Sequence, residues 1–232
     1  MTDGFLPVYK PFGMSSFDVI RQVKRAPGFS GKVGHAGTLD VFACGVLILL
    51  LGKATREFDL FQNFTKTYRA GARLDYLSDT LDVAGELAHQ PLERETRVKW
   101  DDINAVLPQF LGEQQQTIPN YSATKVAGKT RYSLAREGVV TPEVSKLVTI
   151  SRLELVASRF PLVTLDVECS SGTYVRQLTS DIFASMGFAS FLYALERRAI
   201  GPITFQDCIQ MEGLRDETWT QAIRPIESIT HP

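Results

Sequence analysis

The feature that most constrains the fold is an unbroken apolar run, Val46 to Leu51, which follows a glycine-rich segment, GHAGTLD at 34–40. Six consecutive aliphatic residues next to turn-forming glycines are typical of a buried strand. We therefore expect a strand over 45–51, with a loop before it that places Asp40 against the hydrophobic core. A carboxylate in such surroundings requires an explanation, because an ionised group is costly to remove from water.

The remaining hydrophobic patterns predict more strands than helices. The expected strands are 5–9, 66–75, 147–160, 161–170 and a strand-rich stretch over 191–205. The expected helices are 15–26, 54–64, 100–112, 130–138 and one that begins near Thr173 and ends at Gly187. The long alternation of strand and helix that is typical of doubly wound folds is missing. The sequence therefore predicts an α+β fold with a mixed, largely antiparallel sheet and flanking helices.

Length and composition limit the class of protein. The chain has 232 residues, of which 44% are hydrophobic, enough for one large core or two small ones. It contains no apolar stretch of about 18 residues, as a transmembrane helix requires, and its first residues lack the pattern of a signal peptide. Its three cysteines form no CxxC pair, which argues against a disulfide scaffold or a zinc site. We therefore expect a cytoplasmic protein without membrane contact.

Charge is unevenly distributed, although the formal net charge is only −1. Basic side chains are in excess over 1–75 and 125–160, and acidic side chains over 76–124 and 161–232. If the two basic segments meet in the fold, they form a positive face that suits nucleic acid. An ordinary solvated surface explains the same asymmetry, so the charge pattern alone leaves both interpretations open.

Asp40, Arg176 and Tyr68 are the candidates for chemistry. An Asp beside a glycine turn is commonly a turn or capping residue. In apolar surroundings, however, an ionised Asp40 needs a cation, and such a carboxylate can act as nucleophile or general base. Arg176 is the best partner, because it lies in the first turn of a predicted helix, where a cation opposes the helix dipole. Tyr68, between Lys66 and Arg69, is either a platform for a nucleobase or a core tyrosine.

Two other chemistries are disfavoured. The segment GVLILLLGKAT at 45–55 spaces its glycines seven residues apart where a P-loop needs five, and Ala54 stands where a P-loop has Ser or Thr. Cys44 could be a thiolate nucleophile of the kind that pyrimidine methyl transfer uses. Beside the apolar strand, however, a thiol is expected to stay neutral and inert.

Five segments, in order, resemble the motifs of the TruB-type tRNA pseudouridine-55 synthases. They are KPFGMSSFDVI (10–20), GHAGTLDVFACGVL (34–47), KTYRAGARLDYLSDTLDVAGE (66–86), YSATKVAGKTRYSLAREG (121–138) and CSSGTYVRQLTSDI (169–182). The resemblance implies isomerisation of uridine to pseudouridine at position 55 in the T-loop of tRNA, with base flipping and with no cofactor or metal. It makes Asp40 the catalytic aspartate, with Tyr68 stacking on the target base and Arg176 pairing with Asp40.

The resemblance also implies a set of substrate-binding residues. His35 would occupy the space that the flipped nucleotide leaves, and Tyr174 and Leu195 would line the base pocket. The T-arm would be gripped by an insertion around 113–140; the substrate-binding cations are Lys10, Lys125, Lys129 and Arg136. We expect residues 1–232 to form a single catalytic domain without a complete C-terminal PUA module, acting as a monomer with no obligate protein partner.

Departures from the family pattern leave the proposed catalytic set intact. Val41 stands where the family usually has Pro, which reduces the expected rigidity of the loop, and Glu196 stands where an Arg is common. Three chemical mechanisms stay open: attack of Asp40 on C1′, removal of a proton from C2′, and attack on C6 of the base. The alternative functions are an RNA chaperone, a synthase for another RNA or a guide-RNA complex, and a nucleoside hydrolase.

Overall fold

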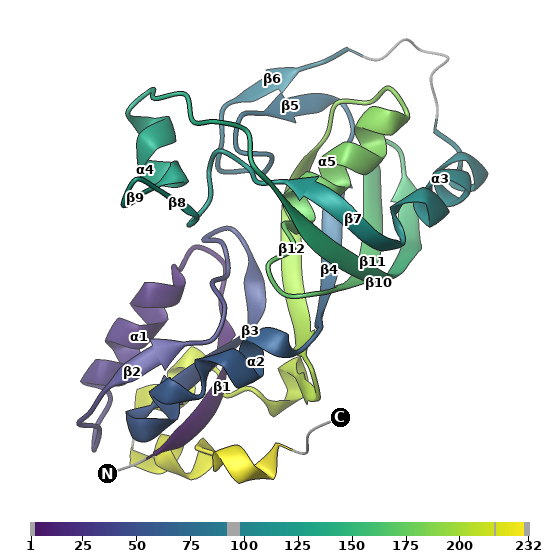
Figure 1. The fold of residues 1–232 in the computed structure, drawn as a ribbon. Helices are drawn as coiled ribbons and strands as arrows, with labels where there is room; N and C mark the ends of the chain where they lie inside the picture. Colours follow the sequence, from purple (N-terminus) through teal and green to yellow (C-terminus); the bar gives the residue numbers. More distant parts are fainter. Residues whose placement is uncertain (1–2, 92–97, 216, 230–232) are drawn as a thin grey trace. The chain divides into compact units, whose positions relative to one another are not determined.

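The computed structural model describes residues 3–91, 98–215 and 217–229 (Figure 1). The chain forms two compact units. Unit 1 contains Met1–Arg69 and Leu195–Pro232, and unit 2 contains Ala70–Ala194. The chain passes between the units after Arg69 and after Ala194, inside strands β4 (Lys66–Arg73) and β12 (Phe191–Ile200).

Unit 1 is built around the predicted apolar strand. This strand, β3 (Cys44–Leu51), pairs antiparallel with β1 (Gly4–Lys10) and β2 (Val33–His35) and parallel with β12. A short strand, β13 (Ile203–Thr204), pairs antiparallel with β12. The helices of unit 1 are α1 (Ser16–Arg25), α2 (Phe58–Asn63) and six-residue or shorter 3-10 segments: η1 (Gly52–Arg56), η3 (Phe205–Asp207), η4 (Met211–Arg215), η5 (Glu217–Ala222) and η6 (Ile226–Ser228).

Strand β3 is apolar throughout because both of its faces are covered. Successive side chains of a strand point to opposite faces. Leu47, Leu49 and Leu51 join the cluster formed by α1 and the C-terminal segment. Their neighbours on the other face, Val46, Ile48 and Leu50, pack in the cluster that contains Phe61 of α2. A strand covered on both sides needs no polar positions, which explains the run.

Helix α1 begins and ends at local signals. Ser15 is its N-cap, and Ser15 and Asp18 form a capping box in which each side chain accepts a hydrogen bond from the other residue's backbone N–H. The helix ends before Pro27, with Lys24 and Arg25 in its last turn, where cations complement the helix dipole. The predicted helix over 15–26 is therefore confirmed.

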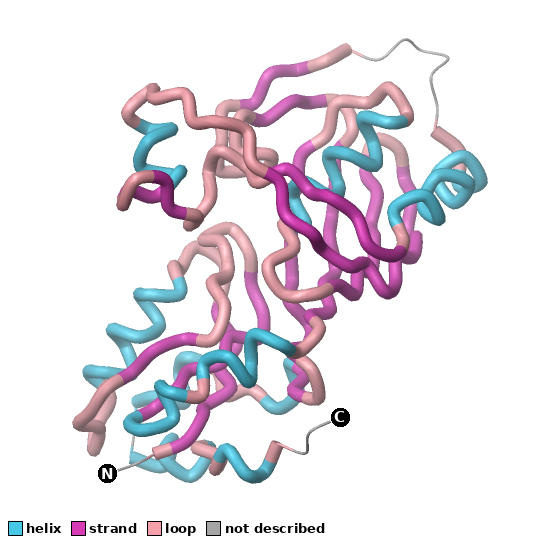
Figure 2. The backbone as a smooth tube through the Cα atoms, in the orientation of Figure 1, coloured by secondary structure: helices cyan, strands magenta, loops and turns pink. Residues whose placement is uncertain are grey.

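In unit 2 the sheet strands run in the order β4, β11 (Leu162–Cys169), β10 (Ser145–Arg159), β7 (Gly112–Thr117), and β10 pairs antiparallel with β11 and β7. Figure 2 shows the strands of the chain in magenta. The long hairpin of β10 (Ser145–Arg159) and β11 (Leu162–Cys169) confirms the predicted strand pair around Pro161. The other strands of unit 2 are β5 (Tyr76–Ser78), β6 (Leu87–His89), β8 (Lys125–Val126) and β9 (Lys129–Thr130). Its helices are α3 (Trp100–Val106), η2 (Leu107–Phe110), α4 (Arg131–Arg136) and α5 (Val175–Ser185).

Three predicted helices differ in detail from the structure. The helix predicted over 100–112 is divided into α3 and the 3-10 segment η2. The N-cap of α5 is Tyr174 rather than Thr173, because the Thr173 hydroxyl donates to the Ser170 carbonyl and so takes part in the preceding turn. The helix predicted over 54–64 is divided at Glu57 into η1 and α2.

The fold class is the predicted one: the sheet is mixed and largely antiparallel, with flanking helices. Within the described ranges, no helix has the length and apolar character needed to cross a membrane. The contact-defined units do not test the expectation of a single catalytic domain, which stays a prediction.

Candidate active site

Asp40 lies in unit 1, in the connection between β2 and β3, which is called the Asp40 loop here (residues 36–43). Although the loop has no regular secondary structure, the carbonyls of residues 37–41 all accept hydrogen bonds. The Arg197 guanidinium donates to the carbonyls of residues 37 and 38, and the Ser16 hydroxyl donates to that of residue 39. The carbonyl of Asp40 accepts from the Ala43 N–H, and that of residue 41 accepts from the Gly13 N–H and the Lys10 ammonium. Because the backbone carbonyls on both sides of Asp40 are hydrogen-bonded, the loop conformation that positions this carboxylate is restrained.

Ser16 and Lys10 come from the KPFGMSS motif. The Ser16 hydroxyl accepts from the Leu39 N–H at 3.0 Å and donates to the Leu39 carbonyl at 3.2 Å. Lys10 is fully buried, and its ammonium donates to the carbonyls of Pro11, Met14 and Val41 at 3.0, 2.6 and 3.5 Å. The observed partners of Lys10 are thus backbone carbonyls of unit 1, and its contact with RNA stays a prediction.

The charge state of Lys10 is sensitive to its surroundings. Burial lowers the pKa of Lys10 from 10.5 to about 8, while the negative charges of Cys44, when ionised, and Asp40 oppose that shift. The motif lysine therefore stays largely cationic at neutral pH.

His35, at the end of β2, is half-buried. Burial lowers the pKa of His35, and the nearby positive charge of Arg197 lowers it further. In the part of the chain that the structure describes, its buried Nδ1 atom has no hydrogen-bond partner. His35 is therefore a neutral, bulky side chain at neutral pH, consistent with a space-filling role, and that role stays a prediction.

Glu196 stands at a position where an Arg is common in the family that the sequence resembles. Its side chain accepts a hydrogen bond from a tyrosine. The Tyr9 hydroxyl donates to Glu196 Oε1 at 3.0 Å and lies 3.4 Å from the Cys44 sulfur. Burial and these two acidic neighbours raise the pKa of Tyr9, so its hydroxyl stays protonated. Tyr68 on β4 and Leu195 on β12, the other two predicted pocket residues of unit 1, are buried at 9% and 5% exposure. Their contacts with a base stay predictions.

Arg176 lies in unit 2, at the second position of α5, and its guanidinium is 4% exposed. It forms an ion pair with Asp82 at 3.2 Å and donates to the carbonyls of Thr80 at 2.6 Å and Tyr121 at 3.0 Å. The cation is therefore buried and held from two segments far apart in the sequence. Because Asp40 belongs to unit 1, the pairing of Arg176 with Asp40 stays a prediction.

Asp82, the ion-pair partner of Arg176, was not singled out from the sequence, although it lies inside the motif segment 66–86. Its Oδ1 atom accepts from the Thr80 hydroxyl at 2.8 Å and the Ala84 N–H at 2.9 Å, which leaves Oδ2 for Arg176. The preceding residue, Leu81, has a φ of +62°, a conformation that is rare outside glycine. Such strain is often found where a functional side chain must be aimed.

Tyr174, a predicted pocket residue of unit 2, is fixed at both ends. Its hydroxyl shares a hydrogen bond with Thr124 at 3.0 Å, and its backbone N–H and carbonyl bond to the Gln116 side chain. The ammonium of Lys146 lies 4.2 Å from the centre of the Tyr174 ring, and it also donates to the Gly172 carbonyl. Burial lowers the pKa of Lys146. This cation was not singled out from the sequence.

The predicted RNA-gripping insertion carries exposed cations. Lys125, Lys129 and Arg136 are exposed on β8, β9 and α4. Lys129 pairs with Glu137 at 2.9 Å, and the Arg136 guanidinium lies 5.0 Å from the centre of the Tyr132 ring. A mixture of exposed cations and an aromatic ring is typical of RNA-binding surfaces.

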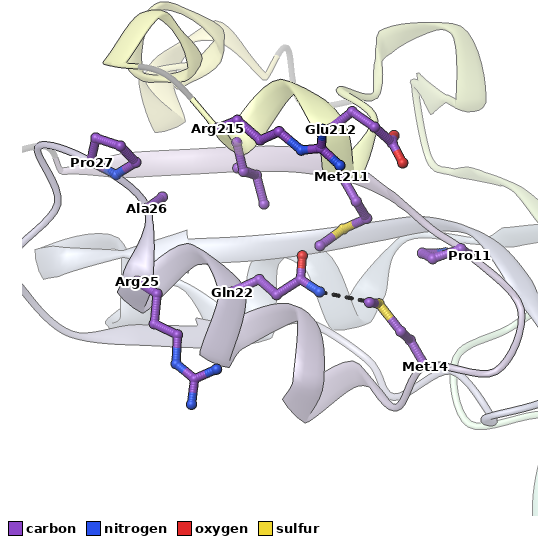
Figure 3. A pocket seen from close by; sticks show the side chains of 10 residues that line it. Pro11, Met14, Gln22, Arg25, Ala26, Pro27, Met211, Glu212 and Arg215 are labelled. Atoms are coloured by element: carbon purple, nitrogen blue, oxygen red, sulfur yellow. Dashed lines mark hydrogen bonds between the residues drawn. The ribbon is translucent and has the colours of Figure 1, made fainter.

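Figure 3 shows a pocket of about 520 Å³ elsewhere in unit 1, between α1 and η4. Its floor includes Met14 and Met211, and Arg25 and Arg215 lie among its lining residues. Asp40 is not one of the lining residues, although Lys10 donates to the carbonyls of two of them, Pro11 and Met14.

Comparisons with known proteins show the family to which the chain belongs. The family model described as "TruB family pseudouridylate synthase (N terminal domain)" matches residues 24–175. A tRNA pseudouridine synthase B from Clostridium novyi (strain NT) is 38% identical over 97% of this chain and 76% of that protein. The protein of the same name from Thermotoga maritima is 36% identical over 98% of this chain and 72% of its own length.

A solved structure is also similar. A chain of the "Crystal Structure of a Cbf5-Nop10-Gar1 Complex" matches with a TM-score of 0.74 and 25% identity, over 97% of this chain. This chain spans 61% of that longer chain. With 152 consecutive residues covered by the family model and relatives above one third identity along nearly the whole chain, this chain belongs to the TruB family of pseudouridylate synthases.

Proposed function

We propose that this chain isomerises uridine to pseudouridine in tRNA, at position 55 of the T-loop. The observation that carries the proposal is the Asp40 loop, in which the carbonyls of residues 37–41 all accept hydrogen bonds around one carboxylate of the motif GHAGTLD. The name tRNA pseudouridine synthase B, which the similar proteins share, supports tRNA as the substrate. The chain is thus an RNA-modifying isomerase.

The net reaction requires no redox partner. The N1–C1′ bond breaks, the uracil turns, and C5 forms a new bond to C1′. The hydrogen on C5 leaves as a proton, and N1 gains a proton, so atoms and electrons balance without a cofactor or a metal. The target base must first leave the folded T-loop, which costs a few kcal/mol.

Asp40 is the group that acts on the nucleotide. It attacks C1′, removes a proton from C2′ or attacks C6, and all three routes start from the ionised carboxylate. Lys10 donates to the Val41 carbonyl and so helps to hold the loop that carries this carboxylate. Arg176 pairs with Asp40 in the assembled site, and Asp82 positions Arg176.

The base needs a surface on which it can turn. Tyr68 stacks on the freed uracil, because stacking tolerates rotation in the plane of the ring. Tyr174 and Leu195 line the pocket, and His35 fills the space that the flipped nucleotide leaves. Lys10 contacts the substrate through its charge.

The insertion around 113–140 grips the T-arm through Lys125, Lys129 and Arg136. Phosphate contacts of this kind supply affinity without reading the sequence. The chain works on tRNA as a cytoplasmic monomer, as one catalytic domain and without an obligate protein partner.

The test uses a tRNA transcript that carries tritium at C5 of its uridines. Wild type should release tritium into water, since bond formation at C5 expels that hydrogen. Asp40→Asn should release none, and Asp59→Asn, an exposed Asp on α2, should match wild type. A transcript with cytidine at position 55 should release no tritium with any of these proteins.

Two results would contradict the proposal. If wild type binds the transcript but releases no tritium, the proposed isomerase activity is wrong, and an RNA chaperone is favoured. If tritium is released from the transcript with cytidine at position 55, the modified uridine lies elsewhere, and the assignment to position 55 is wrong. Free uracil in the reaction would instead indicate a nucleoside hydrolase.

A further inference from the structure

Arg197 is a buried cation that the proposed chemistry does not use. It lies on β12, opposite Gly45 of β3 in the parallel register, and is 2% exposed. In the described part of the chain, no carboxylate lies within ion-pairing distance of its guanidinium. A charged group with this degree of burial needs specific hydrogen bonds, so its partners indicate what it does.

All the partners of the guanidinium are backbone carbonyls. The Nε atom donates to the Val46 carbonyl at 2.7 Å. The two terminal nitrogens donate to carbonyls of the Asp40 loop, Nη1 to Thr38 at 3.3 Å and Nη2 to Gly37 at 3.1 Å. The planar guanidinium presents its donors in a fixed fork. One side chain therefore joins the start of β3 to the loop residues that precede Asp40.

Two motif glycines make room for this contact. Gly45 has a φ of +111°, and a Cβ there would collide with the backbone of Arg197. Gly37 has a φ of +94°, and a Cβ there would lie 3.7 Å from Nη1 of Arg197. A side chain at Gly45 is excluded by space, and one at Gly37 is disfavoured by backbone conformation. The glycines of GHAGTLDVFACG thus allow the loop and the strand to close around the guanidinium.

We infer that Arg197 is a positioning residue for pseudouridine formation, which sets the conformation of the Asp40 loop through the carbonyls of Gly37 and Thr38. The catalytic part of this inference rests on the proposed function, and the effect on loop conformation does not. Ser16 and Lys10 hold the residues that follow, at Leu39 and Val41. Arg197 holds the residues that come before, from a strand about 160 residues further along the chain.

A direct contact of Arg197 with RNA phosphate is the alternative role. Its 2% exposure and three protein acceptors argue against it. The positive charge of Arg197 nevertheless reaches the site, because it lowers the pKa of both His35 and Lys10, after burial in each case. Arg197 therefore acts on the Asp40 loop through hydrogen bonds to its backbone, and on His35 and Lys10 through its charge.

The test measures two quantities on Arg197→Met, which keeps the bulk of the side chain but removes its donors. Amide hydrogen exchange should become faster in a peptide that covers the Asp40 loop, residues 36–43, and should stay unchanged in β1. The kcat for pseudouridine formation should fall by about 100-fold, the effect of a slightly misplaced catalytic group, while the KM for tRNA stays within twofold. Arg197→Lys, which restores a cationic donor, should recover part of the kcat.

A matched control is Arg131→Met. Arg131 is also buried, at 1% exposure, and it also donates to backbone carbonyls, those of Pro119 and Pro142, but in unit 2. Its replacement should leave exchange in the Asp40 loop at the wild-type rate. If Arg197→Met does not fold, Gly37→Ala strains the same contact without removing the charge and should also lower kcat with KM unchanged.

Unchanged loop exchange and unchanged kcat in a folded Arg197→Met variant would overturn the inference. A raised KM with full kcat would overturn it as well and would assign Arg197 to RNA binding. If wild type forms no pseudouridine, the proposed function fails, and faster exchange in the variant would still support the role of Arg197 in holding the loop.

Discussion

Single charged residues hold the Asp40 loop through backbone carbonyls. Lys10 bonds to the carbonyl after Asp40, and Arg197 bonds to the two carbonyls that precede Leu39. The same two side chains therefore restrain the loop backbone on both sides of Leu39 and Asp40. Val41, which replaces the usual Pro, therefore stands in a loop that is restrained by hydrogen bonds instead of by a proline ring.

Lys10 makes a pH prediction possible. Because burial lowers the pKa of Lys10 from 10.5 to about 8, the folded protein carries a cost for the charged ammonium that is fully present below about pH 8. That cost disappears as the pH rises to 10.5, since the unfolded chain binds the extra proton in this window. The free energy of unfolding of wild type, relative to Lys10→Met, should therefore rise across this window in urea titrations. A difference that stays constant with pH would contradict the shift.

Asp82 is predicted to be needed for turnover. Asp82→Asn keeps an oxygen acceptor for the Thr80 hydroxyl and the Ala84 N–H, but it removes the carboxylate charge beside the buried Arg176. Removing one partner of a buried ion pair costs about 3–5 kcal/mol of stability. We expect a lower free energy of unfolding by urea and a lower kcat in the tritium assay, with tRNA still bound. The control is Asp101→Asn, at an exposed Asp of α3, which should change neither the free energy of unfolding nor kcat. A full kcat in Asp82→Asn would show that turnover does not need the Asp82 carboxylate.

Among the elements, β3 and the insertion have opposite characters. Strand β3 is covered on both faces and carries no charged residue, so it is a fixed support for the Asp40 loop at its N-terminal end. The insertion elements β8, β9 and α4 are two to six residues long and carry exposed cations. Short, exposed elements are suited to adapt to a partner, whereas a buried strand is suited to hold a reacting group in place.

The insertion cations should affect RNA affinity and its salt dependence. Replacing Lys125, Lys129 and Arg136 together by Gln should weaken tRNA binding and reduce the slope of log affinity against log salt by about one per lost phosphate contact. Fluorescence anisotropy at several salt concentrations measures both. At saturating tRNA, kcat should be preserved. Arg159→Gln, an exposed Arg of β10 outside the insertion, is the control; an equal slope for the triple variant would exclude phosphate contacts there.

At the scale of the whole molecule, unit 1 is assembled from both ends of the chain. Backbone hydrogen bonds join Phe5 to Arg224 in both directions, and the Trp219 indole donates to the Pro27 carbonyl at 3.0 Å. The Trp219 ring packs near that of Phe29, with ring centres 5.9 Å apart. The C-terminal segment is thus part of the core beneath α1, which itself begins at the residues that hold the Asp40 loop.

Trp219 should therefore contribute strongly to stability. Trp219→Ala removes a side chain that is 2% exposed and should lower the free energy of unfolding by about 3–5 kcal/mol. Trp100, at 46% exposure on α3, is the matched control, and its replacement should cost less than about 1 kcal/mol. Urea unfolding followed by circular dichroism compares the two. Equal losses would mean that the C-terminal segment does not stabilise the core.

Local patterns were enough to predict much of the fold. The capping box and the spacing of apolar residues predicted α1, the apolar run predicted β3, and alternation around Pro161 predicted the hairpin of β10 and β11. These features are readable because caps and hydrophobic periods act between residues close in sequence. The same reasoning placed Asp40 in a loop beside the core.

The partners of the site residues were decided by the tertiary structure alone. Nothing in the sequence near Asp40 indicates that its loop is held by Arg197, about 160 residues away, and nothing near Arg176 selects Asp82 as its buried partner. Hydrogen bonds to backbone carbonyls leave no residue-type signature on the acceptor side, since every residue has the same carbonyl. The sequence by itself therefore determined elements such as α1, β3 and the β10–β11 hairpin, and the loop in which Asp40 lies. Packing decided which side chains hold that loop.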